Sequence, residues 1–282
     1  MKDLRDTLRS TFRRALRLEN RRAAVRPGRF ERVPFESRSL NAVRDVTVYL
    51  PPGYDERPDR RYPVLYMHDG QNLFEADRAF IPGQHWRLNE AADQAIADRR
   101  AEAMILVGID NGGPERIDEY TPTHDPRKNA GGRADDQGQM IIEELKPMID
   151  SRFRTQPEGA HTGIGGSSLG GLLSLHLALK HPEVFGRASV MSPSVWWHDR
   201  VILNDVDAFP HQTWPRIWLD IGAREGLEAL RDARLVRDKL RARGWTDENF
   251  HFHEDKRGDH SERAWAGRAK LMLEFLFPPQ QL

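Results

Sequence analysis

Residues 161–171 read His-Thr-Gly-Ile-Gly-Gly-Ser-Ser-Leu-Gly-Gly, and an apolar run at residues 172–179 follows directly. This order predicts a short strand, a tight turn and a helix, with Ser168 at the centre of a Gly-x-Ser-x-Gly pattern. Such a turn is strained and projects the serine hydroxyl away from the backbone. Gly166 and Gly170 have no Cβ, so the strand and the helix can approach closely around the serine. Because the pattern alone also fits a glycine-rich loop before an ordinary helix, its meaning depends on the rest of the chain.

The composition limits the classes of partner. The chain has 282 residues, a length that one α/β domain can occupy. Lysine plus arginine and aspartate plus glutamate both number 43, so the formal net charge is zero. A balanced charge gives no reason to expect nucleic acid or an anionic membrane, and we expect a small-molecule partner. The absence of cysteine excludes thiol catalysis, thiolate metal ligands and disulfide bonds.

Residues 1–26 are strongly basic and lack an apolar run, so they do not fit a secretory signal. The chain has no segment that is apolar enough to span a membrane, and we expect a cytoplasmic protein. We expect a basic, helical segment at 1–26 and a single α/β domain at 27–282. Leu4, Leu8 and Leu16 recur at helical spacing. This spacing fits a basic helix on a partner or an acidic surface, or a solvated helix along the domain edge.

Apolar runs alternate with amphipathic segments along most of the chain. Besides the strand and helix around Ser168, we expect strands within 27–50, 62–67, 103–109, 188–197, 215–221 and 249–254, and helices at 88–99, 140–151, 227–243 and 261–275. This alternation predicts a mostly parallel central sheet flanked by helices, and we expect no large separate cap domain.

Three side chains with complementary chemistry follow the ends of predicted strands. Ligands of open parallel sheets lie beyond the carboxyl ends of the strands, so Ser168, Glu225 and His260 are expected to converge there. A serine hydroxyl becomes a good nucleophile when an imidazole takes its proton. The imidazole in turn needs a carboxylate that fixes its tautomer and stabilises its charged form.

The choice among eleven histidines and several acids rests on position. His260 follows the last predicted strand, whereas His251 and His253 lie within that strand. Glu225 lies free in a strand-exit loop, whereas Asp220 is still inside its strand and is the reserve candidate for the acid. The order serine, acid, histidine is the order that an α/β-hydrolase requires.

Two backbone amides are candidates for an oxyanion hole. The amide of Leu169 follows the nucleophile and opens a helix, whose N-terminal dipole favours an anion. The second candidate is the amide of Gln71, because Gly70 lets the backbone turn outward after the strand at 62–67. Two preorganised amides would each stabilise the transition state by about 3 kcal/mol.

The candidate substrate pocket involves three loops. Asn72 lies in the loop after the strand at 62–67, and Arg116 and Tyr120 lie in a long polar stretch at 114–136. Trp196, one of two adjacent tryptophans, could line an acyl or aromatic pocket, and filling of the core is an equally good explanation of the pair.

Four segments together resemble a known family. They are residues 69–74 (DGQNLF), 166–171 (GSSLGG), 192–197 (SPSVWW) and 258–260 (GDH). They are similar to the "Putative esterase" family of α/β-hydrolases, which includes enterochelin-type esterases, feruloyl esterases and S-formylglutathione hydrolases. The resemblance runs from about residue 30 to the C-terminus. It implies a triad of Ser168, Glu225 and His260, oxyanion amides at Gln71 and Leu169, and no metal or cofactor.

These observations lead to a functional expectation with two alternatives. The leading hypothesis is a serine hydrolase that cleaves a carboxylic ester or thioester through an acyl-enzyme intermediate. The same residues would support acyl transfer to an acceptor other than water. A non-catalytic binding protein on the same scaffold is the third reading, because a fold does not guarantee its chemistry.

Overall fold

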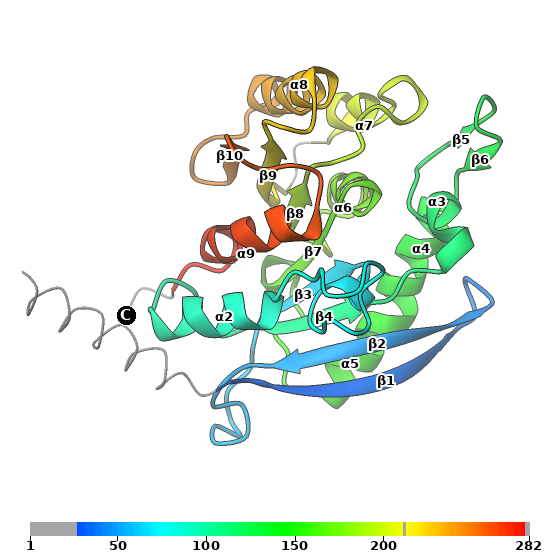
Figure 1. The fold of residues 1–282 in the computed structure, drawn as a ribbon. Coiled ribbons are helices and arrows are strands. Elements are labelled where there is room, and N and C mark those ends of the chain that lie inside the picture. The colour runs from blue at the N-terminus through cyan, green and yellow to red at the C-terminus, as the bar shows by residue number, and fades with distance from the viewer. Residues whose placement is uncertain (1–26, 211–212, 280–282) are drawn as a thin grey trace, which may run out of the picture.

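A computed structural model describes residues 27–210 and 213–279 of the chain. The predicted basic segment at 1–26 lies outside the described residues. The central sheet contains the strands β1 (Arg29–Ser37), β2 (Ala42–Leu50), β3 (Val64–His68), β4 (Ile105–Ile109), β7 (Thr162–Ser167), β8 (Arg187–Met191), β9 (Arg216–Gly222) and β10 (Phe250–Asp255). Their spatial order is β1-β2-β4-β3-β7-β8-β9-β10 (Figure 1). Strand β2 runs antiparallel to both β1 and β4, whereas β4, β3, β7, β8, β9 and β10 are parallel to one another, which confirms the predicted mostly parallel sheet.

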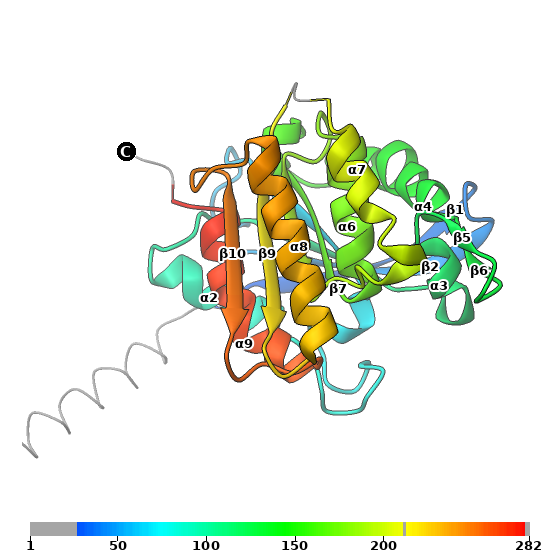
Figure 2. The same cartoon turned by 90° about the horizontal axis from the view of Figure 1, so that it is seen from above.

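Helices cover both faces of this sheet (Figures 1 and 2). They are α2 (Leu88–Ala97), α3 (Arg116–Glu119), α4 (Ala134–Gln139), α5 (Lys146–Arg152), α6 (Leu169–Lys180), α7 (Ile202–Ala208), α8 (Leu227–Arg243) and α9 (Glu262–Leu276). The apolar side chains of α5, α6 and α8 share one core with one face of the sheet, and those of α2 and α9 share a second core with the other face.

The central strands show why their sequences are continuously apolar. In β3, Val64 and Tyr66 belong to the first core, and Leu65 and Met67 belong to the second. Successive side chains of a strand point to opposite faces, so a strand with a helix layer on each side needs an apolar residue at every position.

The nucleophile turn has the expected strand-turn-helix form. Ser168 lies between β7 and α6 with a φ angle of 58°, a conformation that non-glycine residues rarely adopt. A Cβ on Gly166 would lie 2.9 Å from the carbonyl carbon of Gly170. The close contact between strand and helix therefore depends on glycine at this position.

Three segments differ from the sequence expectation. Residues 27–50, expected as one strand, form the antiparallel pair β1 and β2. The helix expected at 140–151 begins earlier, with α4 at Ala134, and passes through a π-helical segment at Met140–Leu145 before α5. Pro147, at the start of α5, has no N–H to donate, so the hydrogen-bond pattern changes in front of it. The polar stretch 114–136 contains α3 and a short hairpin of β5 (His124–Asp125) and β6 (Ala130–Gly131).

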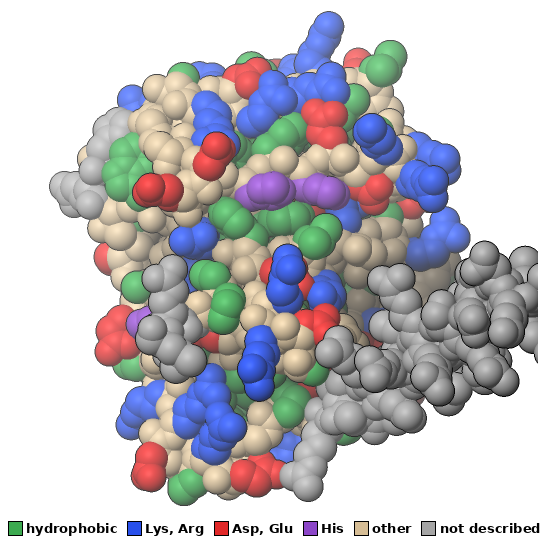
Figure 3. All heavy atoms as spheres, turned by 90° about the vertical axis from the view of Figure 1, so that its left-hand side faces the viewer, with side chains coloured by type: hydrophobic (Ala, Val, Ile, Leu, Met, Phe, Trp, Pro, Cys, Tyr) green, Lys and Arg blue, Asp and Glu red, His purple; other side chains and the backbone are tan. Residues whose placement is uncertain are grey.

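The edge strand β10 carries an aromatic band. His251 and His253, two residues apart, stack on Trp218 of β9 at ring-centroid distances of 4.8 and 5.6 Å. Figure 3 shows histidine and hydrophobic side chains side by side on this surface. Both rings therefore pack on the neighbouring strand.

Among the described residues, no helix is long and apolar enough to cross a membrane.

Candidate active site

Ser168, His260 and Glu225 form a chain of hydrogen bonds at the carboxyl edge of the sheet. The Oγ of Ser168 lies 3.0 Å from Nε2 of His260, and Nδ1 of His260 lies 2.7 Å from Oε2 of Glu225. When Nδ1 carries the ring proton, its N–H donates a hydrogen bond to Glu225, and the lone pair of Nε2 is free to accept a hydrogen bond from the serine hydroxyl. This arrangement allows the imidazole to take the hydroxyl proton.

Glu225 is held by three donors in a site where its side chain is 2% exposed. Besides His260, the backbone amide of Gly222 and the hydroxyl of Ser192 donate to Oε1, at 2.7 and 2.6 Å. Burial on its own would raise the pKa of Glu225, but these hydrogen bonds outweigh burial and hold the pKa below its usual value. The carboxylate is therefore charged at neutral pH and can stabilise a protonated His260.

Asp220, the reserve acid, has other partners. It lies in β9, is completely buried and accepts from Nε1 of Trp218 at 2.8 Å. It also forms an ion pair with Arg268 of α9 at 3.0 Å. Arg268 in turn donates to the hydroxyl of Ser192 at 3.0 Å, so this buried pair lies directly behind Glu225.

His260 faces the surface, with its side chain 47% exposed. The ring of Trp265 in α9 meets the imidazole edge-on, with 5.0 Å between the ring centroids. Ser261 caps α9 by accepting from the amide of Ala264, which fixes where the helix begins. The loop that carries His260 is thus anchored by the helix that follows it.

The two predicted oxyanion amides lie in neighbouring segments. Leu169 is the first residue of α6, and Gln71 lies in a short 3₁₀ turn, Gly70–Asn72, after β3. A Cβ on Gly170 would lie 3.2 Å from Cβ of His68 and 3.3 Å from Oδ2 of Asp69, so the start of α6 lies against the loop after β3. The first amides of a helix have no acceptor within that helix, which leaves them available to an anion.

Asp69 anchors the turn that carries Gln71. Its φ angle is 58°, and its carboxylate accepts from Nε and Nη2 of Arg116 at 2.6 and 2.8 Å. The side-chain amide of Asn111 donates to the same carboxylate at 2.7 Å, and the backbone amide of Asp69 donates to the hydroxyl of Tyr120 at 3.2 Å. Two of the predicted pocket residues, Arg116 and Tyr120, are therefore direct partners of Asp69.

The predicted pocket residues differ in their access to a substrate. Tyr120 is 0% exposed, so its ring has no surface open to a ligand. Asn72 uses its side-chain oxygen to accept from the amide of Phe80 at 2.8 Å. Trp196 is 49% exposed and lies under the ammonium group of Lys128, whereas its neighbour Trp197 is buried and donates to the carbonyl of Thr123. Within the tryptophan pair, one ring fills the core and the other remains available at the surface.

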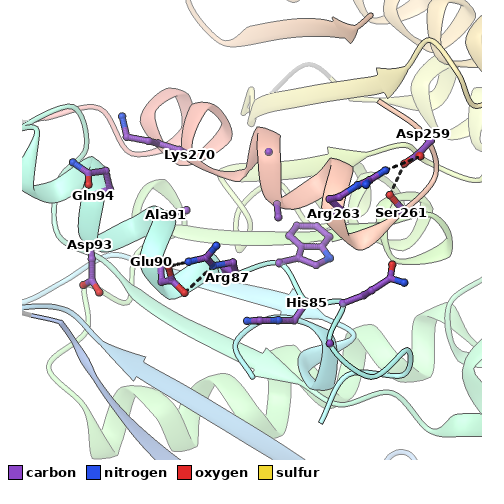
Figure 4. A pocket seen from close by; sticks show the side chains of 15 residues that line it. His85, Arg87, Glu90, Ala91, Asp93, Gln94, Asp259, Ser261, Arg263 and Lys270 are labelled. Atoms are coloured by element: carbon purple, nitrogen blue, oxygen red, sulfur yellow. Dashed lines mark hydrogen bonds and ion pairs between the residues drawn. The ribbon is translucent and has the colours of Figure 1, made fainter. Parts of the chain in front are cut away.

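A groove lined by both polar and apolar side chains is seen in Figure 4. It runs between α2 and α9, and its lining includes His85, Arg87, Asp259 and Arg263. Ser261 also lines it, so both sequence neighbours of His260 border this groove. Among the described residues, no group of three histidine, aspartate or glutamate side chains is placed to bind a metal ion.

Ser192 and Arg268 contact Glu225, Ser194 contacts Ser168, and these three residues were not assigned a role from the sequence. The hydroxyl of Ser194 lies 3.3 Å from Oγ of Ser168. The SPS segment at 192–194 carried a signal in its resemblance to the family, but no pattern in the sequence assigned its hydroxyls a partner. Arg268 had no signal, because one arginine on a charged helix resembles a solvated one.

A mostly parallel sheet with a serine turn after β7, an acid after β9 and a histidine after β10 defines an α/β-hydrolase. A family model described as "Putative esterase" matches residues 37–276. The chain belongs to this esterase family and is a carboxylic ester hydrolase.

The chain is also similar to individual relatives and solved structures. The uncharacterized protein YbbA of Bacillus subtilis is 28% identical over 249 residues, which are 83% of this chain and 92% of YbbA. The ferri-bacillibactin esterase BesA of the same species is 27% identical over 185 residues, and the match covers 61% of each chain. The crystal structure of an IroE-like serine hydrolase from Shewanella oneidensis has a TM-score of 0.72 at 21% identity, covering 88% of this chain and 80% of that one.

Proposed function

We propose that this esterase uses Ser168 as a nucleophile and cleaves a small-molecule carboxylic ester through an acyl-enzyme intermediate. His260 is the general base and then the general acid, and Glu225 orients it. The observation that carries this proposal is the continuous hydrogen-bond chain from Oγ of Ser168 through the imidazole to a buried, charged carboxylate.

The proposed reaction has two halves. In the first, Oγ of Ser168 attacks the ester carbonyl carbon while Nε2 of His260 takes the hydroxyl proton, and His260 then gives this proton to the departing alcohol. In the second, His260 takes a proton from water, which attacks the acyl carbon and releases the acid. Negative charge on the carbonyl oxygen is stabilised by the amides of Gln71 and Leu169, each contributing about 3 kcal/mol.

Labelling with a fluorophosphonate probe tests the nucleophile. We expect the probe to bind covalently to Ser168 in the folded protein, because it reacts with serines that an adjacent base activates. The Ser168→Ala variant should not be labelled and should lose at least about a thousandfold in kcat.

Ser167→Ala is the matched control, because Ser167 is the buried neighbour in β7 and has the same chemistry. It should retain labelling at Ser168, as peptide mass spectrometry would show. Labelling of Ser168→Ala to the same extent as the wild type, or none of the folded wild type, would contradict the proposal.

A panel of ester substrates identifies which acyl and alcohol groups the enzyme accepts. The panel comprises p-nitrophenyl esters of increasing chain length, a feruloyl ester, a thioester and ferri-bacillibactin, the ligand in the name of the relative BesA. We expect hydrolysis of at least one oxygen ester. Product analysis with added sugar or alcohol separates hydrolysis from acyl transfer, because transfer gives a new ester in place of the free acid.

A further inference from the structure

Ser194 is held beside the nucleophile by the backbone. Its amide donates to the carbonyl oxygen of Ser168 at 3.0 Å, and the amide of Ser168 donates to the carbonyl oxygen of Met191 at 3.0 Å. The loop after β8 and the nucleophile turn are therefore joined by two backbone hydrogen bonds. Ser194 is 4% exposed, and its hydroxyl oxygen lies 3.3 Å from Oγ of Ser168.

The direction of the hydrogen bond between the two serines follows from counting protons. Each hydroxyl has one proton to donate and can accept through its lone pairs. When the hydroxyl of Ser168 donates its hydrogen bond to Nε2 of His260, its contact with Ser194 is a hydrogen bond only if the hydroxyl of Ser194 is the donor. The nucleophilic oxygen then donates to the imidazole and accepts from Ser194 at the same time.

We propose that Ser194 is a further catalytic residue, whose hydroxyl donates to Oγ of Ser168 and speeds the release of the acyl group from the enzyme. The inference rests on the acyl-enzyme mechanism proposed above. The imidazole accepts the proton of Ser168, and the oxyanion amides act on the carbonyl oxygen of the substrate. Ser194 is the donor to Oγ of Ser168 itself.

The role belongs mainly to the second half of the reaction. Water attacks the acyl carbon and loses one proton to Nε2 of His260, which gives a tetrahedral intermediate. The bond between the acyl carbon and Oγ then breaks, its electron pair stays on Oγ, and His260 returns the proton to Oγ as the free acid leaves. A donor aimed at Oγ stabilises the negative charge that develops there as the bond breaks.

The same hydrogen bond does not help the first half to the same extent. During acylation, Oγ of Ser168 uses a lone pair to form the new bond, and a donor on that oxygen makes its electrons less available. Loss of the donor is therefore expected to slow deacylation while leaving acylation unchanged or slightly faster. This asymmetry distinguishes a direct role of Ser194 from general damage to the site.

The test compares Ser194→Ala with wild type in single-turnover reactions with a p-nitrophenyl ester and excess enzyme. Release of p-nitrophenolate reports acylation, and the loss of the acyl adduct in quenched samples, followed by intact mass, reports deacylation. We expect the acylation rate of Ser194→Ala to stay within about threefold of wild type and deacylation to be about tenfold slower, as for a hydrogen bond to a charged group.

Two further variants secure the interpretation. Ser189→Ala is the matched control, because Ser189 is a buried serine of the preceding strand, β8, whose hydroxyl has no hydrogen-bond partner among the described residues. Both of its rates should equal those of wild type. Ser194→Cys keeps the size of the side chain but donates weakly, so it should also deacylate slowly, and it decides the matter if Ser194→Ala does not fold.

The failure of this inference differs from the failure of the proposed function. If an adduct forms on Ser168 and decays equally fast in wild type and in the folded Ser194 variants, Ser194 has no catalytic role. Failure of the fluorophosphonate probe to label Ser168 in a folded wild-type protein that turns over the ester overturns both, because Ser168 is then not the nucleophile.

Discussion

Arg116 lies at the outer end of a chain of contacts that reaches the backbone of Gln71. Its guanidinium binds the carboxylate of Asp69 through two hydrogen bonds, and Asp69 precedes the Gly70–Asn72 turn in a left-handed conformation. The side-chain oxygen of Gln71 accepts from the backbone amide of Asn111, whose side-chain amide donates to Asp69. Because a fork of two parallel hydrogen bonds fixes both distance and orientation, Arg116 is well suited to hold the proposed oxyanion amide in place.

Arg116→Gln is therefore expected to affect the chemical step more than substrate binding. We predict a kcat lower by about 10- to 100-fold with KM within about threefold of wild type, because a small displacement of a group that acts in the transition state reduces kcat. Steady-state kinetics on a p-nitrophenyl ester provides the measurement.

A direct contact between Arg116 and substrate would give the opposite pattern, a raised KM with kcat unchanged. The matched control is Arg133→Gln, because Arg133 pairs with Asp136 on the exposed side of the same region. Its kinetic constants should equal those of wild type. Unchanged kinetics in a folded Arg116→Gln would show that the turn holds its shape without the ion pair.

At the residue scale, the sequence shows which polar residues lie in strand-exit loops, but it does not show in which direction each side chain points. Ser168, Glu225 and His260 could be chosen because parallel strands bring their carboxyl ends to one edge. The polar stretch 114–136 gave no indication that Tyr120 points inward. The partners of Ser194 depend on how two loops meet, and no local pattern records that contact.

Helix α6 joins the nucleophile turn to two other helices through His176. Nδ1 of His176 lies 2.7 Å from Asp205 of α7, and Nε2 lies 3.1 Å from Asp135 of α4, which also binds Lys180. Burial on its own would lower the pKa of His176, but the hydrogen bonds and charges of Asp205 and Asp135 outweigh it and raise the pKa. In its protonated form the imidazole donates to both carboxylates and links three helices.

The link predicts a pH-dependent contribution to stability. A raised pKa in the folded state stabilises the fold fully below the unfolded pKa of about 6.5, and this stabilisation is lost as pH rises through the folded pKa. We expect His176→Gln to lower the free energy of unfolding by about 1–2 kcal/mol at about pH 6 and by less at about pH 9. Urea unfolding followed by circular dichroism at both pH values measures the difference.

His181→Gln is the control for this experiment, because His181 follows the end of the same helix and is only partly buried, with Glu183 at 3.6 Å. Its effect should be small at both pH values. A loss of stability in His176→Gln that is the same at both pH values would assign the role of His176 to packing instead of charge.

At the element scale, periodic segments were predictable and irregular ones were not. The amphipathic pattern of α8 and the glycine after it marked that helix from Leu227 to Arg243. The polar residues of α4 concealed the true start of the helix expected at 140–151, because only its later turns carry an apolar stripe. Helix α7 lies in 194–214, where short turns and loops follow one another without a clear period.

The whole fold was more predictable than its parts because it follows from one requirement. Helices on both faces of a parallel sheet demand apolar side chains at successive strand positions, and β3 and β4 meet this demand. Residues 27–50 form two antiparallel strands, β1 and β2, but the sequence predicted one strand there, because the alternation of residue types continues through both.

Charge is balanced over the whole chain but unevenly distributed along the sequence. Residues 1–26 contain nine basic and three acidic side chains, whereas the chain contains 43 of each, so residues 27–282 carry six more acidic than basic groups. Removal of residues 1–26 should therefore lower the isoelectric point well below 7.2 and raise solubility at about pH 7, because molecules with a net charge repel one another. Isoelectric focusing and light scattering measure these changes.

The same deletion tests whether the basic segment belongs to the site. Each residue proposed to act on the ester lies after residue 26, and the matched esterase region begins at residue 37. We therefore expect kcat/KM for an uncharged ester to stay within about twofold of the full chain, since a neutral substrate is not steered by net charge. A larger loss in a folded, shortened protein would show that residues 1–26 contribute to the binding or conversion of the substrate.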